Sequence, residues 1–600
     1  MAMKKILSVL AVFVCAVSFG QNINPTVEVT NIYQGNPSEV HKPQLGMAIP
    51  DSLMRFDMDF GYEVFEKPYQ GAYNFKPYQL AMRPDKDAYR GRKLYLKAGA
   101  GYSLRPQLDF VFSPEQSGPF QMSVYANHRS YFGKYNIITP VPYQDFNGMD
   151  KVPGKSYNGH DAVTKVGLDG RYNWEEAVLS FDIGYYGLLT KDTLLNRSYN
   201  AFDYNVRFTS NKDDDKYIFY DVALGGRFGS DMLKYTNNYV LPGINGEKNL
   251  NENLVLFTAN AGPVLSRTQR VLVGLEAETA SYRRDLFRGN AGRIALIPRY
   301  QFNYGPWNLS VGLKVETLLT SKDSLSFQSM FSKRGSLVYP DVHARYTVND
   351  NLLAYANLTG GARMNTYSSL IAANHHFNPG YYAWTDRLIP LLDNSIDKID
   401  FNVGVKGNLL SMLQYEVRGG VKKVENGYLD APVFSYSIPK PGGVYSDYSL
   451  IYADLLLGLH YGDFDIDGGI HLRKTTFDEE KAPGLILPPF YCDLKAVYNF
   501  SPRLYAGMTV QASSARKGYS NELFVDIDPV DPDNVSYRNL SHYPFRVPGY
   551  LDLGLLAGYK LNRKLGVWLE SGNLLCETIQ RNPFYSEKDL WVTAGITLNL

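Results

Sequence analysis

The sequence predicts an all-β protein that forms a large transmembrane antiparallel β-barrel of about 22 strands, with 20 as the main alternative count. Three observations predict this fold. Apolar and polar residues alternate along most of residues 92–600, the connections between these segments are alternately tight and long, and no stretch of comparable quality has helical periodicity. A transmembrane barrel has short periplasmic turns on one rim and long extracellular loops on the other, as this rhythm requires.

The composition excludes several other classes of protein. The 600 residues contain 61 Lys and Arg against 60 Asp and Glu, so the net charge of +1 gives no electrostatic footprint for nucleic acid. Aromatic residues make up 14%, which is too many for a disordered chain, and three Cys cannot build a disulfide scaffold. Tyrosine is unusually frequent at 47 residues. Because tyrosine concentrates where apolar surface meets water, this excess favours a membrane protein.

Residues 1–20 are interpreted as a secretory signal peptide. Two lysines precede the apolar run 6–17, and small residues precede the expected cleavage site after Gly20. No later stretch is apolar and long enough for a transmembrane helix. After cleavage only Cys492 and Cys576 remain, and they could pair.

Residues 21–91 form a separate segment in front of the barrel. They are punctuated by proline and contain a small duplication, Lys-Pro-Tyr-Gln at 67–70 and again at 76–79. The residue before each proline is biased toward extended conformations. Because the segment is rich in aromatic residues, we expect it to pack in the periplasmic mouth or lumen of the barrel, or on a partner, rather than to act as a flexible tether.

The barrel strands are predicted from their period of two. In 307–315, Trp307 and every second residue after it are apolar, while the residues between them are Asn, Ser, Gly and Lys. The last segment alternates up to Leu600. The strands are expected near 92–103, 106–113, 119–130, 163–172, 177–189, 199–210, 216–228, 251–263, 269–283, 293–304, 307–320, 335–347, 352–364, 397–408, 412–424, 448–461, 464–475, 487–499, 503–514, 547–560, 564–573 and 589–600.

The long polar connections are expected near 131–162, 229–250, 366–396, 425–447, 515–546 and 574–588. Tyrosines near the strand ends are expected to form aromatic girdles at the membrane interfaces: Tyr185, Tyr186, Tyr300, Tyr304, Tyr461, Tyr498 and Tyr559. Charged residues of both signs are expected to face the lumen: Lys314, Glu316, Lys406, Asp465, Asp467 and Arg473.

Taken together, the strand count, the turn and loop rhythm and the apolar-ended strand 590–600 resemble the barrel of TonB-dependent receptors, in the Bacteroidota style. The resemblance implies insertion by the outer-membrane assembly machinery and a location in the outer membrane, in contact with its lipid and lipopolysaccharide. It also implies a receptor or transport role. The segment 21–91 departs from the family because it lacks the run of Gly-rich strands expected for the N-terminal plug domain. A barrel of this size is normally plugged, so its own segment, infolded loops or a partner should fill the lumen.

Catalytic motifs are not evident, and we expect a protein that is not an enzyme and has no cofactor. The best candidate metal site is a weak calcium site formed by Asp526, Asp528, Asp531 and Asp533, whose near-alternate carboxylates could surround Ca²⁺. Two prolines between them favour a rigid turn instead. The pair His375-His376 is interpreted as a polar loop tip rather than a metal site.

Two functions follow from the sequence. The first is a plugless transport channel or receptor barrel for an unknown solute. The second is a structural or assembly subunit of a larger outer-membrane complex, with periplasmic or outer-membrane protein partners and no nucleic acid. In the second, the N-terminal segment or a partner closes the lumen.

Overall fold

The computed structural model of the protein describes residues 93–600 apart from the following stretches: 115–117, 141–148, 194, 211–216, 236–245, 286–287, 321–330, 332–334, 380–391, 410–411, 432, 436–437, 441–442, 478–483, 528–534 and 584. The signal peptide and the segment 21–91 lie outside the described residues, so both stay predictions.

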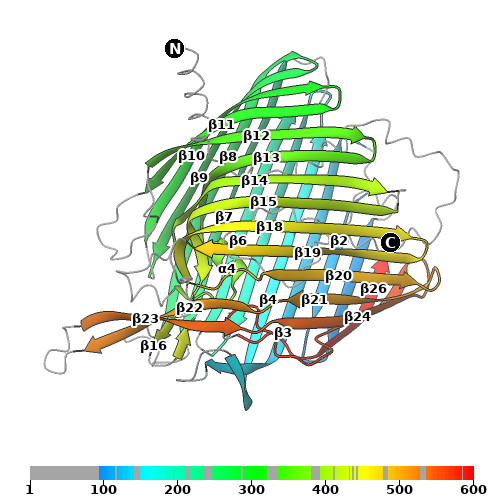
Figure 1. Ribbon diagram of the computed structural model, residues 1–600. Helices are drawn as coiled ribbons and strands as arrows, with labels where there is room; N and C mark the ends of the chain where they lie inside the picture. The colour runs from blue at the N-terminus through cyan, green and yellow to red at the C-terminus, as the bar shows by residue number, and fades with distance from the viewer. Residues whose placement is uncertain are drawn as a thin grey trace.

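The described strands form one closed antiparallel sheet of 22 strands, which confirms the predicted fold class (Figure 1). Its first half consists of β1 Leu94–Gly101, β2 Gln107–Phe112, β3 Phe120–Pro140, β4 Met149–Asn173, β5 Ala177–Lys191, β6 Leu195–Ser210, β7 Ile218–Tyr235, β8 Gly246–Ser266, β9 Gln269–Arg284, β10 Gly289–Tyr304 and β11 Trp307–Thr320. Its second half consists of β12 Gly335–Asn349, β13 Leu352–Met364, β14 Asn394–Leu409, β15 Leu413–Asp430, β18 Gly443–Tyr461, β19 Phe464–Phe477, β20 Phe490–Asn499, β21 Leu504–Ser513, β24 Tyr550–Lys560, β25 Leu565–Gly572 and β26 Trp591–Asn599.

The barrel closes where β1 pairs with β26, with Tyr95 opposite Asn599. The first residue of β1 and the last residue of β26 lie at the same rim of the barrel. This rim also carries the tight turns, such as 305–306, 350–351 and 462–463. Single-chain outer-membrane barrels place this rim in the periplasm. The opposite rim, which carries the long connections, therefore faces the cell exterior.

Alternate residues of each strand form an apolar belt on the outside. On β9, Val271, Val273 and Leu275 are exposed while Leu272 between them is buried. Most of the predicted girdle tyrosines are likewise exposed. Tyr186 is the exception: it is buried, because neighbours in a strand point to opposite faces and Tyr185 already points outward. The girdle prediction was wrong for Tyr186, which faces the lumen.

Many inward-facing tyrosines have a structural role that the girdle interpretation missed. Tyr452 of β18 lies on Gly420 of β15, and its hydroxyl donates to Asp400 on β14 at 3.1 Å. Other tyrosines repeat this pattern of tyrosine, glycine and acid on three successive strands: Tyr125 with Gly167 and Asp182, Tyr199 with Gly229 and Glu252, and Tyr355 with Gly404 and Glu416. The glycine leaves room for the ring, and the acid satisfies the buried hydroxyl.

The exterior rim is more ordered than the sequence indicated. The expected loops 131–162, 229–250 and 425–447 are largely strand, because β3, β4, β7, β8, β15 and β18 continue through them. The expected loop 515–546 contains the hairpin of β22 Arg516–Ile527 and β23 Val535–Val547, which joins β16 Val433–Ser435 and β17 Ile438–Lys440 in a second, four-stranded sheet. This hairpin protrudes from the barrel at the lower left of Figure 1.

These segments were expected to be loops but form strands, because they lie outside the bilayer. Outside the bilayer a strand no longer needs an apolar outer face, so its period of two fades. Helix is confined to one described element, α4 Tyr367–Ala373, inside the expected loop 366–396. Among the described residues, no helix has the length and hydropathy needed to span a membrane.

Replacing Gly420 by valine should destabilise the barrel by about 1–3 kcal/mol, the usual cost of overpacking. A Cβ at this position would lie 2.6 Å from Cζ of Tyr452 and 2.7 Å from the carbonyl oxygen of Phe401. Gly419 is the matched control, since its Cβ would meet nothing closer than 3.7 Å. Free energies of unfolding in lipid vesicles test this: equal losses for Gly420→Val and Gly419→Val would contradict the packing role of the tyrosine.

Candidate functional site in the barrel lumen

The candidate site is the part of the lumen entered by the described residues of the β13–β14 loop, 365–379 and 392–393. The loop begins with α4, whose N-cap Thr366 accepts a hydrogen bond from the backbone N–H of Ser369. The N-terminus of α4 rests on the carboxylate of Glu252 from β8, which accepts from the backbone N–H of Ser368 at 3.1 Å. A carboxylate at this end of a helix is favourable because the exposed N–H groups and the helix dipole attract negative charge.

The loop is held by an apolar core inside the barrel. Tyr367, Ile371 and Phe377 are buried against inward-facing wall residues of β4–β10 and against Phe331 and Leu392. The wall contributes Val163, Tyr186, Leu188, Leu195, Tyr199, Ala201, Leu233, Tyr235, Leu250, Ala280, Tyr282 and Ala291. Apolar side chains on a lumen wall would be unfavourable in contact with water. The wall is therefore built to receive this loop.

A buried ion pair anchors the loop at its tip. Arg197 of β6 pairs with Asp231 of β7 at 2.9 Å, and neither side chain is accessible. The Arg197 guanidinium also donates to the carbonyl oxygens of His375, at 2.6 Å, and of Phe377. The hydroxyl of Tyr367 donates to the other side of the pair, Asp231. Burial raises the pKa of the Tyr367 phenol well above its usual value, so the group stays a donor.

The two histidines of the loop face carboxylates of the wall rather than water. Nδ1 of His375 lies 2.8 Å from Asp161, and Nδ1 of His376 lies 3.2 Å from Asp192. The ring of His376 stacks on Tyr585 with centroids 3.8 Å apart. His375 and His376 therefore form a polar loop tip, and the inward fold of the loop carries this tip into the protein.

Tyr585 belongs to the β25–β26 loop (573–590), and it also forms a bridge with Ile137 of β3. This loop is attached to the exterior end of β3, where the side chain of Asn136 donates a hydrogen bond to Asp589 at 2.8 Å. Arg516 of β22 donates to the carbonyl oxygen of Arg581 at 2.6 Å. Burial of Arg516 lowers its pKa to about 10, which still leaves the guanidinium charged at neutral pH. The two loops thus meet through His376 and Tyr585, and each is attached to its own part of the wall.

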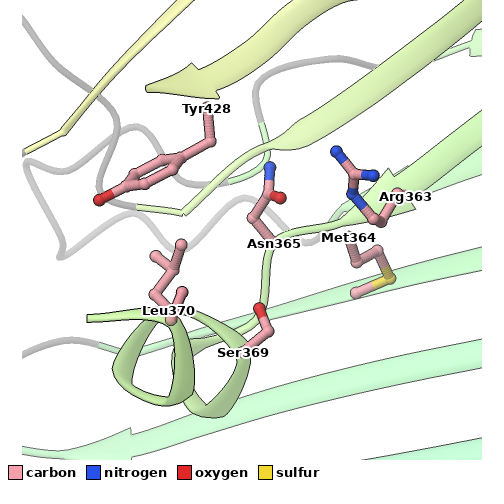
Figure 2. A pocket seen from close by; sticks show the side chains of 7 residues that line it. Arg363, Met364, Asn365, Ser369, Leu370 and Tyr428 are labelled. Carbon is pink, nitrogen blue, oxygen red and sulfur yellow. The ribbon is translucent and has the colours of Figure 1, made fainter. Parts of the chain in front are cut away.

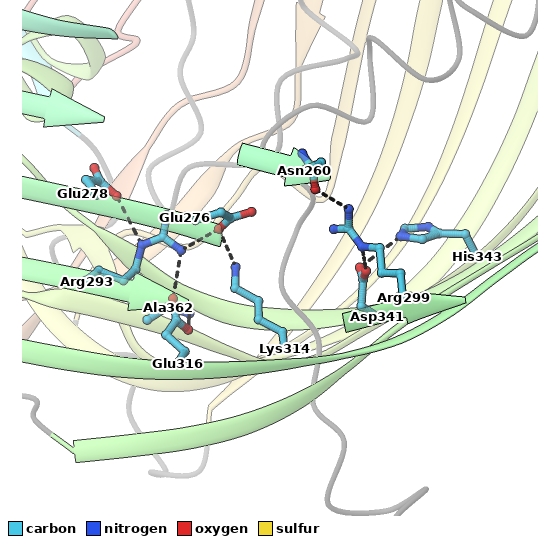
Figure 3. Close-up of polar contacts among 10 residues, drawn as sticks. All are labelled: Asn260, Glu276, Glu278, Arg293, Arg299, Lys314, Glu316, Asp341, His343 and Ala362. Carbon is cyan, nitrogen blue, oxygen red and sulfur yellow. Dashed lines mark hydrogen bonds and ion pairs between the residues drawn. The ribbon is translucent and has the colours of Figure 1, made fainter. Parts of the chain in front are cut away.

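An ionic network on the wall contacts the end of β13, from which the β13–β14 loop begins (Figure 3). Arg293 of β10 contacts three carboxylates, Glu276, Glu278 and Glu316, at 2.8–3.2 Å. Lys314 adds a second cation on Glu276 at 3.0 Å. The free oxygen of Glu316 accepts from the backbone N–H of Ala362 at 2.7 Å, next to the irregularity of β13 at Gly361. The network therefore sets the backbone that leads into the loop.

A second group of the same wall contains Arg299, Asp341 and His343, with Asn260 completing the guanidinium contacts (Figure 3). Lys314 and Glu316 face the lumen as predicted. The mixture of both signs on the lumen wall has a simple cause, because buried charges of one sign require partners of the other.

A small cavity lies beside α4, between the helix, the end of β13 and Tyr428 of β15 (Figure 2). It is lined by Arg363, Met364, Asn365, Ser369, Leu370, Ala373 and Tyr428. Its volume of about 30 Å³ has room for about two water molecules. A cavity of this volume is too small to hold a solute larger than a few atoms.

The remaining site predictions have different outcomes. Asp526 lies on β22 opposite Ser536, whereas Asp528, Asp531 and Asp533 lie outside the described residues, so the calcium site stays a prediction. Across the described residues, no group of three or more His, Cys, Asp or Glu is arranged to hold a metal. Cys492 and Cys576 are free thiols and do not form a disulfide.

Sequence reasoning missed the residues that hold the loops: Arg197, Asp231, Glu252, Arg516 and Tyr585. Each contacts a residue far along the chain; Arg197 and Phe377, for example, are separated by 180 positions. No local pattern marks such contacts. One signal was available: Leu250 and Tyr282 are apolar residues on the polar face of their strands, where a lumen filled with water would not favour them.

No protein-family model matches the chain, and no curated protein sequence is similar to it. Several solved structures share its fold. The FrpB iron transporter from Neisseria meningitidis has a TM-score of 0.59 at 11% identity, covering 85% of this chain and 81% of FrpB. The copper transporter OprC has a TM-score of 0.58 at 12% identity, covering 85% and 80%. The ferric-catecholate import receptor Fiu from E. coli K12 has 0.56 at 10%, covering 85% and 82%.

The closed sheet, the apolar outer belt and the polar lumen define an outer-membrane β-barrel. More narrowly, the chain shares its barrel fold with these iron and copper transporters and with the ferric-catecholate import receptor. At 10–12% identity the similarity concerns the fold.

Arg197→Ala should release the tip of the β13–β14 loop, because it leaves the Asp231 carboxylate buried without its cation. Loss of one partner of a buried pair costs about 3–5 kcal/mol. The expected result is faster hydrogen exchange at the amides of α4 in the folded barrel. Arg207→Ala is the matched control, since Arg207 also joins β6 to β7, through Asp221, but away from the loop. Unchanged exchange in the Arg197 variant would exclude the anchoring role.

Proposed function

We propose that the protein is a receptor-type transport barrel whose exterior end is closed by its own β13–β14 and β25–β26 loops. The observation that carries this proposal is the apolar core between the first loop and the wall strands β4–β10. Such a core has no use in an open diffusion pore. The core is useful in a barrel whose lumen stays closed until a solute binds, because it holds the closing loop in place.

The electrostatics of the lumen support the same function. Arg197 and Asp231 neutralise each other, and Arg293 is matched by the carboxylates around it. These pairs stay within the wall, so opening the lumen requires the β13–β14 loop to break its hydrogen bonds to Arg197, Asp231 and Glu252 together with the apolar contact. A solute that binds the loops from outside can compensate for this loss only by making contacts with the open form. In this proposal the two loops take the place of a plug domain.

The similar structures add a second support. Their names describe transporters of iron and copper and a ferric-catecholate receptor. We propose that this protein takes up a solute across the outer membrane and does not act as an enzyme.

Conductance in planar bilayers tests the closure. The intact barrel should be electrically silent, whereas replacing residues 366–391 by a short Gly-Ser linker should produce a large, steady conductance. The reason is that the deletion removes α4 and the loop half of the apolar core.

Trimming the β22–β23 hairpin between Leu523 and Leu540 serves as the control, because this hairpin protrudes from the barrel (Figure 1). The trimmed variant should stay silent. A steady conductance from the intact barrel, or a silent loop deletion, would show that this loop is not the barrier.

The structural or assembly subunit remains a second proposal. It is favoured by the four-stranded sheet of β16, β17, β22 and β23 beyond the barrel rim, which provides a platform that transport does not require. Crosslinking in intact cells followed by purification separates the two functions. A stoichiometric outer-membrane partner lost on trimming the β22–β23 hairpin supports the subunit, and loss of solute uptake without loss of a partner supports the transporter.

Calcium binding at Asp526, Asp528, Asp531 and Asp533 is also a proposal. Titration calorimetry of Ca²⁺ into the purified barrel should show one ion bound with a Kd of about 10⁻⁴–10⁻³ M, the range of extracellular modules. Asp526→Asn together with Asp528→Asn should abolish the heat signal. A signal that survives in this double variant excludes the site.

A further inference from the structure

The outer surface of the barrel carries a feature that transport does not use. We propose that Lys423 and Lys474 form a docking site for the phosphate groups of an anionic lipid in the outer leaflet, with Lys398 at its edge. The site lies on the outer faces of β14, β15, β18 and β19. The proposal does not depend on the proposed transport function.

Each lysine stands where the apolar belt of its strand ends. On β15 the exposed outward residues Val417 and Val421 are followed by Lys423. On β19 the exposed Ile470 and Leu472 are followed by Lys474. Both lysines are themselves exposed. A cation at this depth is level with the lipid headgroups, while the residues below it contact acyl chains.

The two lysines flank a common apolar surface. In the strand register, Ile451 of β18 pairs with Val421 on one side and with Lys474 on the other. Lys423 pairs with Ser449, the next outward residue of β18. Ile451 is among the most exposed apolar residues of the belt, at 52%. An acyl chain over Ile451 would therefore place its headgroup between the two ammonium groups.

The charges of the surroundings leave these two lysines available. Lys398 is already paired with Glu425 at 2.6 Å. Asp447, a second carboxylate near this site among the described residues, accepts a hydrogen bond from the backbone N–H of Asn426. Within the described part of the chain, neither Lys423 nor Lys474 forms an ion pair. By contrast, Lys234 at the same rim is paired with Glu247.

The occupant follows from the depth and the side of the membrane. These strand ends belong to the exterior rim, opposite the rim that holds the ends of β1 and β26. The molecules that offer an acyl chain and a phosphate at this place are outer-leaflet lipids such as lipid A. A protein partner would leave no reason for the lysines to stop at the edge of the lipid-facing belt.

Native mass spectrometry of the purified full-length barrel with bisphosphorylated lipid A tests the proposal. We expect one lipid bound to the wild type, and binding weaker by more than about 30-fold in the double variant Lys423→Glu, Lys474→Glu, since each lysine near an anionic surface contributes about a factor of five and each glutamate adds repulsion. Lipid A from which both phosphates have been removed should bind equally weakly to wild type and variant.

The control is Arg563→Glu with Lys564→Glu, which makes the same change of charge in the exposed turn at the periplasmic rim. It should bind lipid A like the wild type. Heat-modifiable mobility on gels verifies that each variant is folded. Equal binding by the wild type and the Lys423/Lys474 variant overturns the proposal, as does an equal loss in the control. If the Glu variant does not fold, Lys423→Gln with Lys474→Gln replaces it, with a smaller loss in the same direction.

Discussion

Pairing of buried charge is the constraint on which this structure depends. The lumen of the barrel is lined by the polar faces of its strands, and where loops fill the lumen the water that would solvate those faces is expelled. Arg197 with Asp231, and Arg293 with its carboxylates, are the result. An unpaired charge in such surroundings costs several kcal/mol, so the wall and the loops have to match each other residue by residue. The loops are consequently part of the folded core.

The same constraint explains the tyrosine and glycine content. A tyrosine ring fills space in the lumen wall, but its hydroxyl needs a partner when it is buried. The repeated arrangement of tyrosine, glycine and acid on adjacent strands, as in Tyr452, Gly420 and Asp400, provides both. The excess of tyrosine therefore has two sources: the membrane interfaces, where Tyr304 and Tyr461 are exposed, and the inner wall.

Much of the barrel could be predicted from the sequence because the bilayer imposes a pattern on every strand. Lipid requires an apolar residue at each outward position, so the segments between 94 and 599 could be counted and their strand number confirmed. The pattern fails outside the bilayer, where β3 and β4 continue as strand without it. It also fails for the infolded loops, whose positions depend on contacts such as that of Arg197 with the His375 carbonyl oxygen. Tyr186 shows a limit of predicting girdle residues from composition alone. Adjacent residues of a strand point to opposite faces, so Tyr185 and Tyr186 cannot both face the membrane.

The seating of the β13–β14 loop has a consequence for biogenesis. Its partners Arg197, Asp231, Glu252 and Tyr282 all belong to β6–β9, which precede the loop in the chain. Most of the loop's binding surface therefore precedes it in the chain, whereas Tyr428 of β15 and Tyr585 of the β25–β26 loop follow it. Because β6–β9 precede the loop, it is able to pack against them before the pairing of β1 with β26 closes the barrel, and the contact with Tyr585 completes its surroundings afterwards.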